Sequence, residues 1–443
     1  MAAIKKVNRT AYCIFAKKLS MLTIHSLEED KENIIIGLKK RGFDKLELID
    51  EAIAQNDKRK AAKKSLDDKL AESNALSKQI GQLFASGNRE EAEKVKEKTA
   101  GLKEESKQLQ EDLHDAENKL QQALEQIPNV PHETIPAGNS EADNVVVSEE
   151  GNIPELGENA LPHWELMDKY ELGSLSLGNK ITGAGFPVFT GKGARLQRAL
   201  VQYFLDKASD AGYKEVIPPY LVNEDTAYGT GQLPDKEGQM YEMKLEKYFL
   251  LPTAEVPVTN IYRDHIFKED ELPQKLTAHS HCFRREAGSY GKEVRGLNRV
   301  HQFEKVEIVQ FVHPKKSYAV LDEMVLHVEH LLQELGLPYR KLLLCGGDMG
   351  FTSAMTYDLE VYSAAQKMWL EVSSISNFET FQSNRMKIRY KDENNKSQLI
   401  HTLNGSALAL PRIYAAILEN NQSEDGITIP KVLQAYTGFE KIG

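Results

Sequence analysis

Cysteine is scarce in this sequence. The chain of 443 residues has three, Cys13, Cys282 and Cys345, and none pairs with another cysteine or a histidine at the spacing of a zinc site. Scattered thiols of this kind are typical of proteins from a reducing compartment. We therefore expect a cytoplasmic protein without zinc, whose cysteines act as small buried apolar side chains.

Other features are also missing. No apolar run is long enough to span a bilayer, so we expect no transmembrane helix and no membrane partner. The sequence lacks a Walker loop and a G-x-G-x-x-G motif, which argues against the common nucleotide-binding sheets. The net charge of −10 argues against indiscriminate binding to nucleic acid, but it does not exclude a local basic surface.

The first twenty residues lack acids altogether. Their bases give them a faint likeness to an organelle transit peptide; these are Lys5, Lys6, Arg9, Lys17 and Lys18. The alternative is a wrongly assigned start codon or an expression extension, because Met21 opens a segment that reads as a natural beginning. We favour the alternative and expect residues 1–20 to be a non-native or disordered extension.

Residues 46–127 carry the clearest structural pattern. Along the second half, small and apolar residues alternate spacings of three and four, which predicts a coiled-coil helix. A compatible but more polar pattern runs along the first half. The first set of positions is Leu48, Ala52, Gln55, Arg59, Ala62, Leu66, Lys69, Ser73, Leu76, Ile80 and Leu83; the second is Ala92, Val95, Thr99, Leu102, Ser106, Leu109, Leu113, Ala116, Leu120, Ala123 and Ile127.

The segment Ala85-Ser86-Gly87-Asn88 separates the two patterns. Gly87 allows the left-handed backbone that ends a helix, and Asn88 can cap the next one. A short loop between two heptad helices predicts an antiparallel hairpin. At about 1.5 Å per residue, its arms would be on the order of 55–60 Å long.

The first arm is basic. Between residues 58 and 83, seven bases face three acids in an acidic protein. The bases are Lys58, Arg59, Lys60, Lys63, Lys64, Lys69 and Lys78. Such a face favours contact with the phosphates of an RNA, but a plain solvated face and a dimerisation coiled coil remain open.

The remainder of the chain mixes helices and strands. Pro128 and Pro131 end the hairpin, so we divide the chain into an N-terminal domain at 21–130 and a larger domain at 131–443. Helices are expected at 191–211 and 412–421. Strands are expected at 216–222, 248–251, 280–285, 300–311, 357–362 and 368–373. Strands without regular βαβ alternation predict an α+β fold on a largely antiparallel sheet.

The segment from His281 to Phe303 holds the densest set of polar residues. It reads as a strand, a charged glycine-rich loop and a returning strand. On a strand, Arg284 and Glu286 would share one face, where a guanidinium and a carboxylate can serve a phosphate and a base amino group. Taken alone, the pair is more often a surface ion pair.

The Phe-Arg-x-Glu strand, its loop and the returning strand resemble motif 2 of the class II aminoacyl-tRNA synthetases. The string through Phe303 resembles the seryl-tRNA synthetase family in particular. Met21 to Phe43 and Ala435-Tyr436-Thr437-Gly438 are similar to that family's start and end, so the resemblance covers all but residues 1–20. The Pro218-Pro219 strand and the helix before it resemble motif 1, which forms a homodimer interface in class II enzymes.

Residues 403–412 resemble motif 3, with two departures. Ala407 and Pro411 stand where glycines are often found. The change at Ala407 is mild if its φ is negative, and Pro411 fits the first turn of the final helix. We therefore expect Arg412 to keep its place.

The resemblance implies roles in ATP binding. Arg284 would hold the α-phosphate and Glu286 the adenine amino group, while Phe303 and Arg412 cover the two faces of adenine and Arg299 reaches the terminal phosphates. Glu371 and Ser374 would hold Mg²⁺ through ATP. The remaining implied ATP-binding residues are Arg285, Val300, Val372 and Ser373. The catalytic residues would be Arg284, Arg412 and Glu371.

The resemblance also implies a serine pocket. Its residues would be Thr253, Ala254, Glu255, Arg284, Glu307, Asn404 and Ser406. The implied enzyme is a ligase that converts L-serine and ATP to seryl-adenylate and transfers serine to tRNA(Ser), and to tRNA(Sec) where that tRNA exists. The hairpin would grip the tRNA with Lys58, Arg59, Lys60, Lys63, Lys64 and Lys69.

Two alternatives stay open at this point. One is a relative that loads an amino acid onto a carrier protein, which lacks a full tRNA-binding arm. The other is an RNA-binding paralogue with an inactive site. The intact Arg284, Glu286, Glu307, Glu371 and Arg412 disfavour the second.

Overall fold

The computed structural model describes residues 23–235, 237–286 and 295–443. The chain divides into two compact units. The first holds Glu47–Gln126 and the described residues up to Ile34, and the second holds Ile35–Leu46 and Ile127–Gly443. Cys13 and the basic residues of the extension lie outside the described part, as does the predicted start at Met21.

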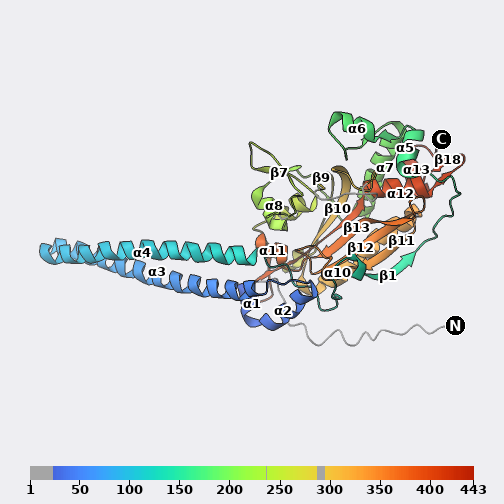
Figure 1. Cartoon of the computed structure of the whole chain (residues 1–443). Helices are drawn as coiled ribbons and strands as arrows, with labels where there is room; N and C mark the ends of the chain where they lie inside the picture. The colour runs from blue at the N-terminus through green and yellow to red at the C-terminus, as the bar shows by residue number, and fades with distance from the viewer. Residues whose placement is uncertain (1–22, 236, 287–294) are drawn as a thin grey trace, which may run out of the picture. The chain divides into compact units, whose positions relative to one another are not determined.

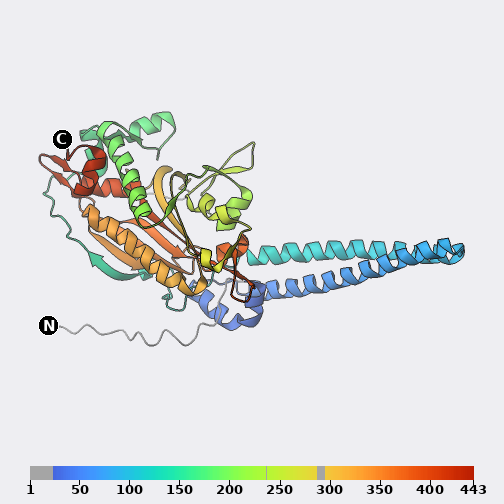
Figure 2. The same ribbon diagram turned by 180° about the vertical axis from the view of Figure 1, so that it is seen from behind.

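The first unit is dominated by a helical hairpin. Helix α3 spans Glu47–Ala85 and α4 spans Arg89–Leu124, and the two run side by side in both views (Figures 1 and 2). Gly87 between them has φ +84°, the left-handed conformation that glycine adopts without strain. With 39 and 36 residues, the arms are about 54–59 Å long at 1.5 Å per residue. The predicted hairpin is confirmed.

The heptad positions face the neighbouring arm. Ala52, Ala92, Leu102 and Ala116 are buried, and the polar seam positions of α3 are half-buried. One expected detail is wrong: Asn88 precedes α4, but its side chain makes no capping hydrogen bond. Helix α1 (Ile24–Glu29) packs on α3, and α2 (Lys31–Lys40) follows it.

The six basic residues proposed for tRNA differ in exposure. Lys58, Lys60, Lys63 and Lys64 are exposed. Arg59 and Lys69 are half-buried on the seam; Arg59 donates to Asn56, and Lys69 forms an ion pair with Glu105 at 2.6 Å. The outer face of α3 therefore offers fewer basic groups than the sequence suggests.

The second unit is built on a mainly antiparallel sheet. Among the described residues, eight strands form it in the order β1-β11-β12-β13-β16-β10-β9-β4, and only the β4–β9 pair is parallel. The strands are β1 (Val145–Glu150), β4 (Lys214–Glu215), β9 (Gln274–Phe283), β10 (Gln302–Val312), β11 (Tyr339–Leu343), β12 (Met355–Ser363), β13 (Met368–Asn377) and β16 (His401–Ala409). The expected α+β class is confirmed.

Helices and small sheets complete this unit. The helices are α5 (His163–Lys169), α6 (Leu175–Ile181), α7 (Gly191–Asp210), α8 (Glu224–Thr230), α9 (Glu255–Thr259), α10 (Ser317–Leu335), α11 (Phe381–Arg385), α12 (Leu410–Asn420) and α13 (Lys431–Thr437). The minor strands are β2 (Gly173–Ser174), β3 (Val188–Phe189), β5 (Leu221–Asn223), β6 (Tyr241–Glu242), β7 (Tyr248–Leu250), β8 (Ile266–Lys268), β14 (Arg389–Lys391), β15 (Ser397–Leu399), β17 (Gln422–Ser423), β18 (Gly426–Thr428) and β19 (Lys441–Ile442).

The two faces of the large sheet are covered differently. Helices α7, α10 and α12 pack on one face, where Val306 and Ile308 of β10 join the main hydrophobic core; Figure 2 shows α10 running along the sheet. The alternate residues Val309 and Phe311 point to the other face, toward α9 and the segment after α11. This second face carries the candidate site.

Several expected boundaries shift. The helices at 191–211 and 412–421 correspond to α7 and α12, and the strand at 280–285 is the end of the longer β9. The continuous strand at 216–222 is wrong, because β4 ends at Glu215 and β5 begins at Leu221. Pro218 and Pro219 lie between them, where they cannot donate to a ladder.

Candidate active site

The pairing register of the strands places several of the predicted site residues on one face of the large sheet. Glu307 of β10 lies opposite Ser406 of β16, and Asn404 lies opposite Ser376 of β13. Phe303 precedes Glu307 by four residues on β10, so alternation turns it to the same side. The sheet therefore joins residues that are far apart in the chain, on the face opposite α7, α10 and α12.

A β-bulge adds Glu371 and Ser374 to this face. Residues three apart on a regular strand point to opposite sides. Here Ser374 pairs with Asp358 but Glu371 pairs with Glu360, so Val372 is the extra residue of a bulge. Asp358 and Glu360 are two apart on β12 and share a face, which means that Glu371 and Ser374 share it too.

Motif 3 ends with Arg412 in the first turn of α12. Pro411 occupies the start of that helix, where its missing N–H has no intrahelical partner, and Ala407 does not have a positive φ. The placement of Pro411 in the first turn is confirmed, and Ala407 meets the condition for a mild change. The Arg412 Nε donates to the Asn298 carbonyl at 2.9 Å, and a terminal nitrogen donates to the Glu371 carbonyl at 2.6 Å.

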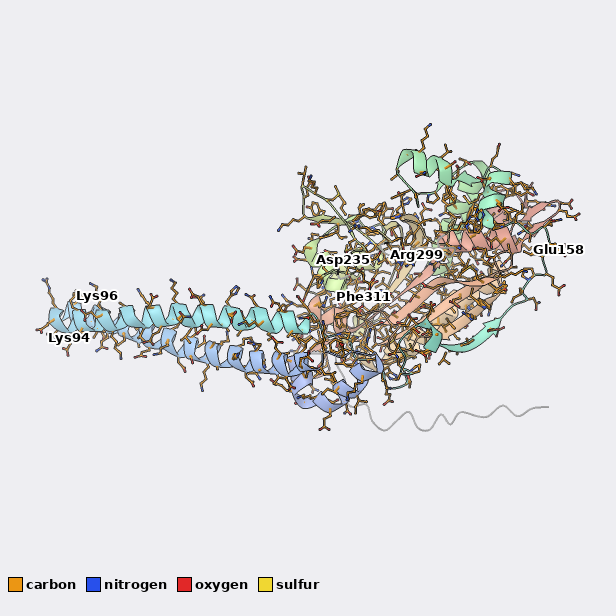
Figure 3. The ribbon with its side chains drawn as sticks, viewed as in Figure 1. Lys94, Lys96, Glu158, Asp235, Arg299 and Phe311 are labelled. Atoms are coloured by element: carbon orange, nitrogen blue, oxygen red, sulfur yellow. The ribbon has the colours of Figure 1, made fainter. Side chains whose placement is uncertain are left out.

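The motif 2 residues lie beyond the end of their strand. Strand β9 ends at Phe283 and Glu286 has φ +50°, so the expectation that Arg284 and Glu286 share a strand face is wrong. Arg284 lies over the Phe303 ring at 5.3 Å and donates to the Pro252 carbonyl at 3.3 Å. Arg299 forms an ion pair with Glu286 at 2.5 Å; Figure 3 marks its place. The residues 287–294 of the loop lie outside the described part.

The Thr253–Glu255 loop meets β10 in a buried polar cluster. The Thr253 hydroxyl donates to Glu307 Oε2 at 3.2 Å, and Lys305 Nζ lies 2.6 Å from the same oxygen. Gln382 donates to Glu255 Oε1 at 2.6 Å. The three charged side chains are at most 9% exposed. Such burial requires that nearly every charge has a partner.

Burial also changes the acidity of Glu255. Desolvation, followed by the negative charge of Glu307, raises the pKa of the Glu255 carboxyl to about 7. When Glu255 is ionised, the cluster holds two carboxylates and one ammonium, Lys305. One negative charge is then uncompensated, which favours a ligand that brings an ammonium group.

Some predicted residues do not offer a free polar side chain to the site. Ala254, Val300 and Val372 are buried in apolar surroundings. The Ser373 hydroxyl donates to the Ser406 carbonyl at 2.6 Å. Arg285 is exposed, and its backbone N–H donates to the Gln239 carbonyl. Contact between a ligand and the first four of these residues would have to use their backbone atoms.

The residues around Glu371 suit a magnesium ion that is bound together with ATP. Glu371 is exposed and Ser374 half-buried, and Asp358 presents a buried oxygen, Oδ1, that has no hydrogen-bond partner. Burial and the charge of Glu371 hold the pKa of the Asp358 carboxyl well above its usual range. Mg²⁺ prefers few carboxylates combined with phosphate oxygens. Among the residues that the structure describes, no cluster of three or more His, Cys, Asp or Glu side chains forms a complete metal site.

Sequence reasoning missed Lys305, Gln382 and Asp358. Lys305 precedes Glu307 by two residues, so strand alternation alone indicates that both side chains share a face. Gln382 is brought in by α11, and Asp358 becomes relevant only through its pairing with Ser374. No local pattern marks either of these two.

Two family models match the chain. The seryl-tRNA synthetase N-terminal domain matches residues 21–131, and the tRNA synthetase class II core domain (G, H, P, S and T) matches residues 240–421. A serine–tRNA ligase from Salinibacter ruber is 49% identical over 96% of this chain and 99% of its own length. The chain belongs to the seryl-tRNA synthetase family.

Other members of the seryl-tRNA synthetase family agree in sequence and structure. A serine–tRNA ligase from Methylobacillus flagellatus is 45% identical over 94% of this chain and 98% of its own. The crystal structure of the Pyrococcus horikoshii seryl-tRNA synthetase complexed with ATP superposes with a TM-score of 0.87, at 31% identity over 95% of this chain and 99% of the other. Membership in this family confirms the resemblance read from motifs 2 and 3.

The hairpin belongs to the matched region. The N-terminal family model spans all of α3 and α4, so the arm is a family feature. This finding weighs against the carrier-protein alternative, whose members lack a full arm. None of the helices in the described ranges combines the length and apolar character needed to cross a bilayer.

Proposed function

We propose that the chain is a serine–tRNA ligase, which activates L-serine with ATP and transfers it to tRNA. One observation carries the proposal: the sheet face that holds Phe303, Glu307, Glu371 and Ser406 adjoins the buried polar cluster of Thr253, Glu255 and Lys305. The chain's family and its serine–tRNA ligase relatives support the same activity.

The first step joins serine to the nucleotide. The serine carboxylate attacks the α-phosphorus of ATP in line, the bond to the leaving oxygen breaks, and pyrophosphate departs. Arg284 would hold the α-phosphate and Arg412 would cover adenine opposite Phe303. No protein nucleophile is needed, since the chain contributes positioning and positive charge.

Glu286 and Arg299 would act at the two ends of ATP. Glu286 would accept from the adenine amino group, and Arg299 would bind the terminal phosphates. In the structure these two side chains bind one another. ATP binding therefore exchanges one ion pair for two ligand contacts, and the polar groups stay paired in both states.

The pocket suits the polar groups of serine. Glu307 and Glu255 would accept from the ammonium and the hydroxyl, and the amide of the buried Asn404 and the hydroxyl of Ser406 would donate to the substrate. Alanine would leave these groups unpaired, a discrimination that can reach about 10⁴. Threonine would be excluded by lack of room.

Magnesium would bind through Glu371 and Ser374 together with the phosphates. When bound, it neutralises phosphate charge and orients the leaving pyrophosphate. The chain itself orients Glu371 through the bulge at Val372 and through the contact of Arg412 with the Glu371 carbonyl.

The second step transfers serine to tRNA. A terminal ribose hydroxyl of the tRNA attacks the seryl carbonyl and AMP leaves. The hairpin would hold the tRNA, with the exposed Lys58, Lys60, Lys63 and Lys64 of α3 at the phosphates. The substrates would be tRNA(Ser) and, where it exists, tRNA(Sec).

The enzyme would work as a homodimer in the cytoplasm. The motif 1 segment supports the dimer, because Ile217 is an apolar side chain that is 85% exposed in the single chain. A hollow of about 590 Å³ also lies between α7 and the helix-covered face of β9 and β10. Its lining includes His279, His281 and Glu304. The free thiols of Cys282 and Cys345 suit a reducing compartment.

Pyrophosphate exchange measured with each amino acid in turn tests the proposal. We expect exchange that depends on serine, and charging of tRNA(Ser) by the same preparation. Exchange with threonine or alanine but not serine would refute serine activation. Tight tRNA binding without exchange for any amino acid would favour the inactive RNA-binding alternative.

A further inference from the structure

A buried histidine–glutamate pair lies outside the residues that the proposed function uses. His163 begins α5 and Glu419 lies near the end of α12, and both side chains are 0% exposed. Ionisable side chains are seldom buried without a specific arrangement of partners. Glu419 is also two helical turns from Arg412, whose helix it shares.

The carboxylate of Glu419 is saturated with donors. Its Oε1 accepts from the His163 backbone N–H at 2.7 Å, from His163 Nδ1 at 2.6 Å and from Gln366 Nε2 at 2.9 Å. Its Oε2 accepts from the Ser363 hydroxyl. Glu419 thereby joins α5, α12 and the turn between β12 and β13.

The other imidazole nitrogen reaches the end of motif 2. His163 Nε2 accepts from the Leu297 backbone N–H at 2.7 Å. Because Nε2 accepts this N–H, the ring proton lies on Nδ1, which donates to Glu419, and this arrangement defines one tautomer. Gly296 permits this approach: its φ is +69°, and a Cβ there would lie 2.1 Å from His163 Nε2.

The neighbouring residue Asn298 closes a ring of contacts. Its side chain donates to Gln366 Oε1 at 2.8 Å, and its carbonyl accepts from Arg412 Nε at 2.9 Å. Gln366 in turn donates to Glu419, which lies seven residues after Arg412 on α12. The ring therefore runs from Arg412 through Asn298, Gln366 and Glu419 back along the helix to Arg412.

We propose that His163 is a positioning residue that, with Glu419 and Gln366, fixes segment 297–298 and through it the guanidinium of Arg412. The inference rests on the proposed role of Arg412 at adenine. Without the bond from its Nε to the Asn298 carbonyl, the long Arg412 side chain would be free to sample more rotamers. Fixing it beforehand reduces the entropy that ATP binding must overcome.

Two conservative variants of the full-length protein separate the two sides of the ring. In His163→Gln, the amide reaches the place of Nε2 and can still accept from Leu297. In His163→Asn, the shorter amide takes the place of Nδ1, keeps the bond to Glu419 and loses Leu297. We expect His163→Asn to raise the Kd for ATP, measured by calorimetry, by about tenfold. His163→Gln should stay within about threefold of the parent protein.

The matched control is Gln422→Ala. Gln422 bonds to both backbone groups of Leu161 and to the Glu419 carbonyl, so its loss loosens the same joint without touching segment 297–298. We expect a lower Tm and an unchanged Kd for ATP. An equal loss of ATP affinity in Gln422→Ala, or in His163→Gln, would show that the joint is merely structural and would overturn the proposal.

An unchanged Kd for ATP in His163→Asn would also overturn it. If His163→Asn does not unfold cooperatively, the variant Gln366→Leu is used in its place. Gln366 lies in a partly exposed turn, and this substitution removes its hydrogen bond with Asn298. Weaker ATP binding supports the proposal and unaltered binding refutes it. Calorimetry needs no amino acid, so a parent protein that binds ATP but shows no serine exchange would count against the ligase activity alone.

The KM for serine supplies a second readout. We expect the KM for serine to stay within about twofold in His163→Asn. The reason is that Thr253, Glu255 and Glu307 lie outside the ring of contacts formed by Arg412, Asn298, Gln366 and Glu419. A parallel rise of both constants would indicate general damage to the site and would contradict a role confined to Arg412.

Discussion

At the scale of single residues, Arg284 is the position at which we expect a substitution to lower activity strongly. Its guanidinium lies over Phe303 and beside the Pro252 carbonyl, between the places assigned to adenine and to serine. We expect Arg284→Ala to lower serine-dependent pyrophosphate exchange by at least about 10²–10³-fold, because a preorganised charge at the α-phosphate is lost. Near-normal exchange in a folded variant would contradict the assigned role.

Glu255 predicts a pH dependence for serine. The pKa of its buried carboxyl is raised to about 7, so in the empty enzyme Glu255 is neutral below that pH and charged above it. If the carboxylate accepts from serine, kcat/KM for serine falls as the pH drops below about 7, with unit slope. The measurement is serine-dependent exchange from about pH 6 to pH 8.5 with ATP saturating.

The variant Glu255→Gln removes the titrating group while keeping the shape of the side chain. We expect a lower and flat profile over the same range. If the acid limb persisted unchanged in Glu255→Gln, another group would be responsible for it.

The sequence predicted many of these residues but not their assembly. Glu307 and Ser406 were found by resemblance, and their cross-strand pairing confirms that they share a face. Lys305, Gln382 and Asp358 escaped notice because their importance arises from tertiary contacts and from register. The strand placement of Glu286 was wrong because β9 already ends at Phe283 and Glu286 has a positive φ, a conformation of which a glutamate gives no local signal.

At the scale of elements, the hairpin offers a test that is independent of the catalytic site. We expect the pair Lys63→Glu and Lys64→Glu to raise the KM for tRNA by about tenfold or more, since two basic groups on α3 would turn into like charges at the phosphates. The slope of log KM against log salt should fall by roughly 0.7–0.9 for each lost contact. Serine-dependent pyrophosphate exchange should be unchanged.

The control is the pair Lys94→Glu and Lys96→Glu on α4. Both lysines are exposed and lie near the loop of the hairpin (Figure 3), and each forms an ion pair with an acid of its own helix. We expect a smaller effect on tRNA from this pair. Equal losses from both pairs would show only that net charge matters, and no effect from either would remove tRNA binding from this face.

The elements themselves were predicted unevenly. The hairpin follows from heptad spacing and one glycine loop, which are local signals. Of the large sheet, β10, β12, β13 and the end of β9 were located, but β1, β11 and β16 were missed. The segment 216–222 was predicted as one strand although two prolines break its ladder. The order of the eight strands depends on pairing between segments that are far apart in the chain. Local patterns in a single sequence do not predict such pairing.

At the scale of the whole molecule, the motif 1 segment should control assembly. We expect Ile217→Asp to convert a dimer into a monomer of 49.9 kDa, because a charge replaces an apolar side chain that is 85% exposed in the single chain. Sedimentation velocity at micromolar protein measures the change. The control is Leu245→Asp, at a residue that is 89% exposed between β6 and β7; loss of the dimer in this control would contradict a specific role for motif 1.

If Glu371 and Ser374 bind metal and phosphate as proposed, the bulge at Val372 makes the exact length of β13 important for the reaction. Side chains alternate between the two faces of a strand. Glu371 and Ser374 are three residues apart, so they point to the same face only because the bulge adds one residue between them. Deleting Val372 would leave the side chains of Glu371 and Ser374 unchanged. It would nevertheless turn one of the two to the opposite face of the sheet, which is covered by helices. In comparisons among relatives, a one-residue gap at this point should therefore be as disabling as the loss of Glu371 itself, and a search that scores only residue identity would overlook it.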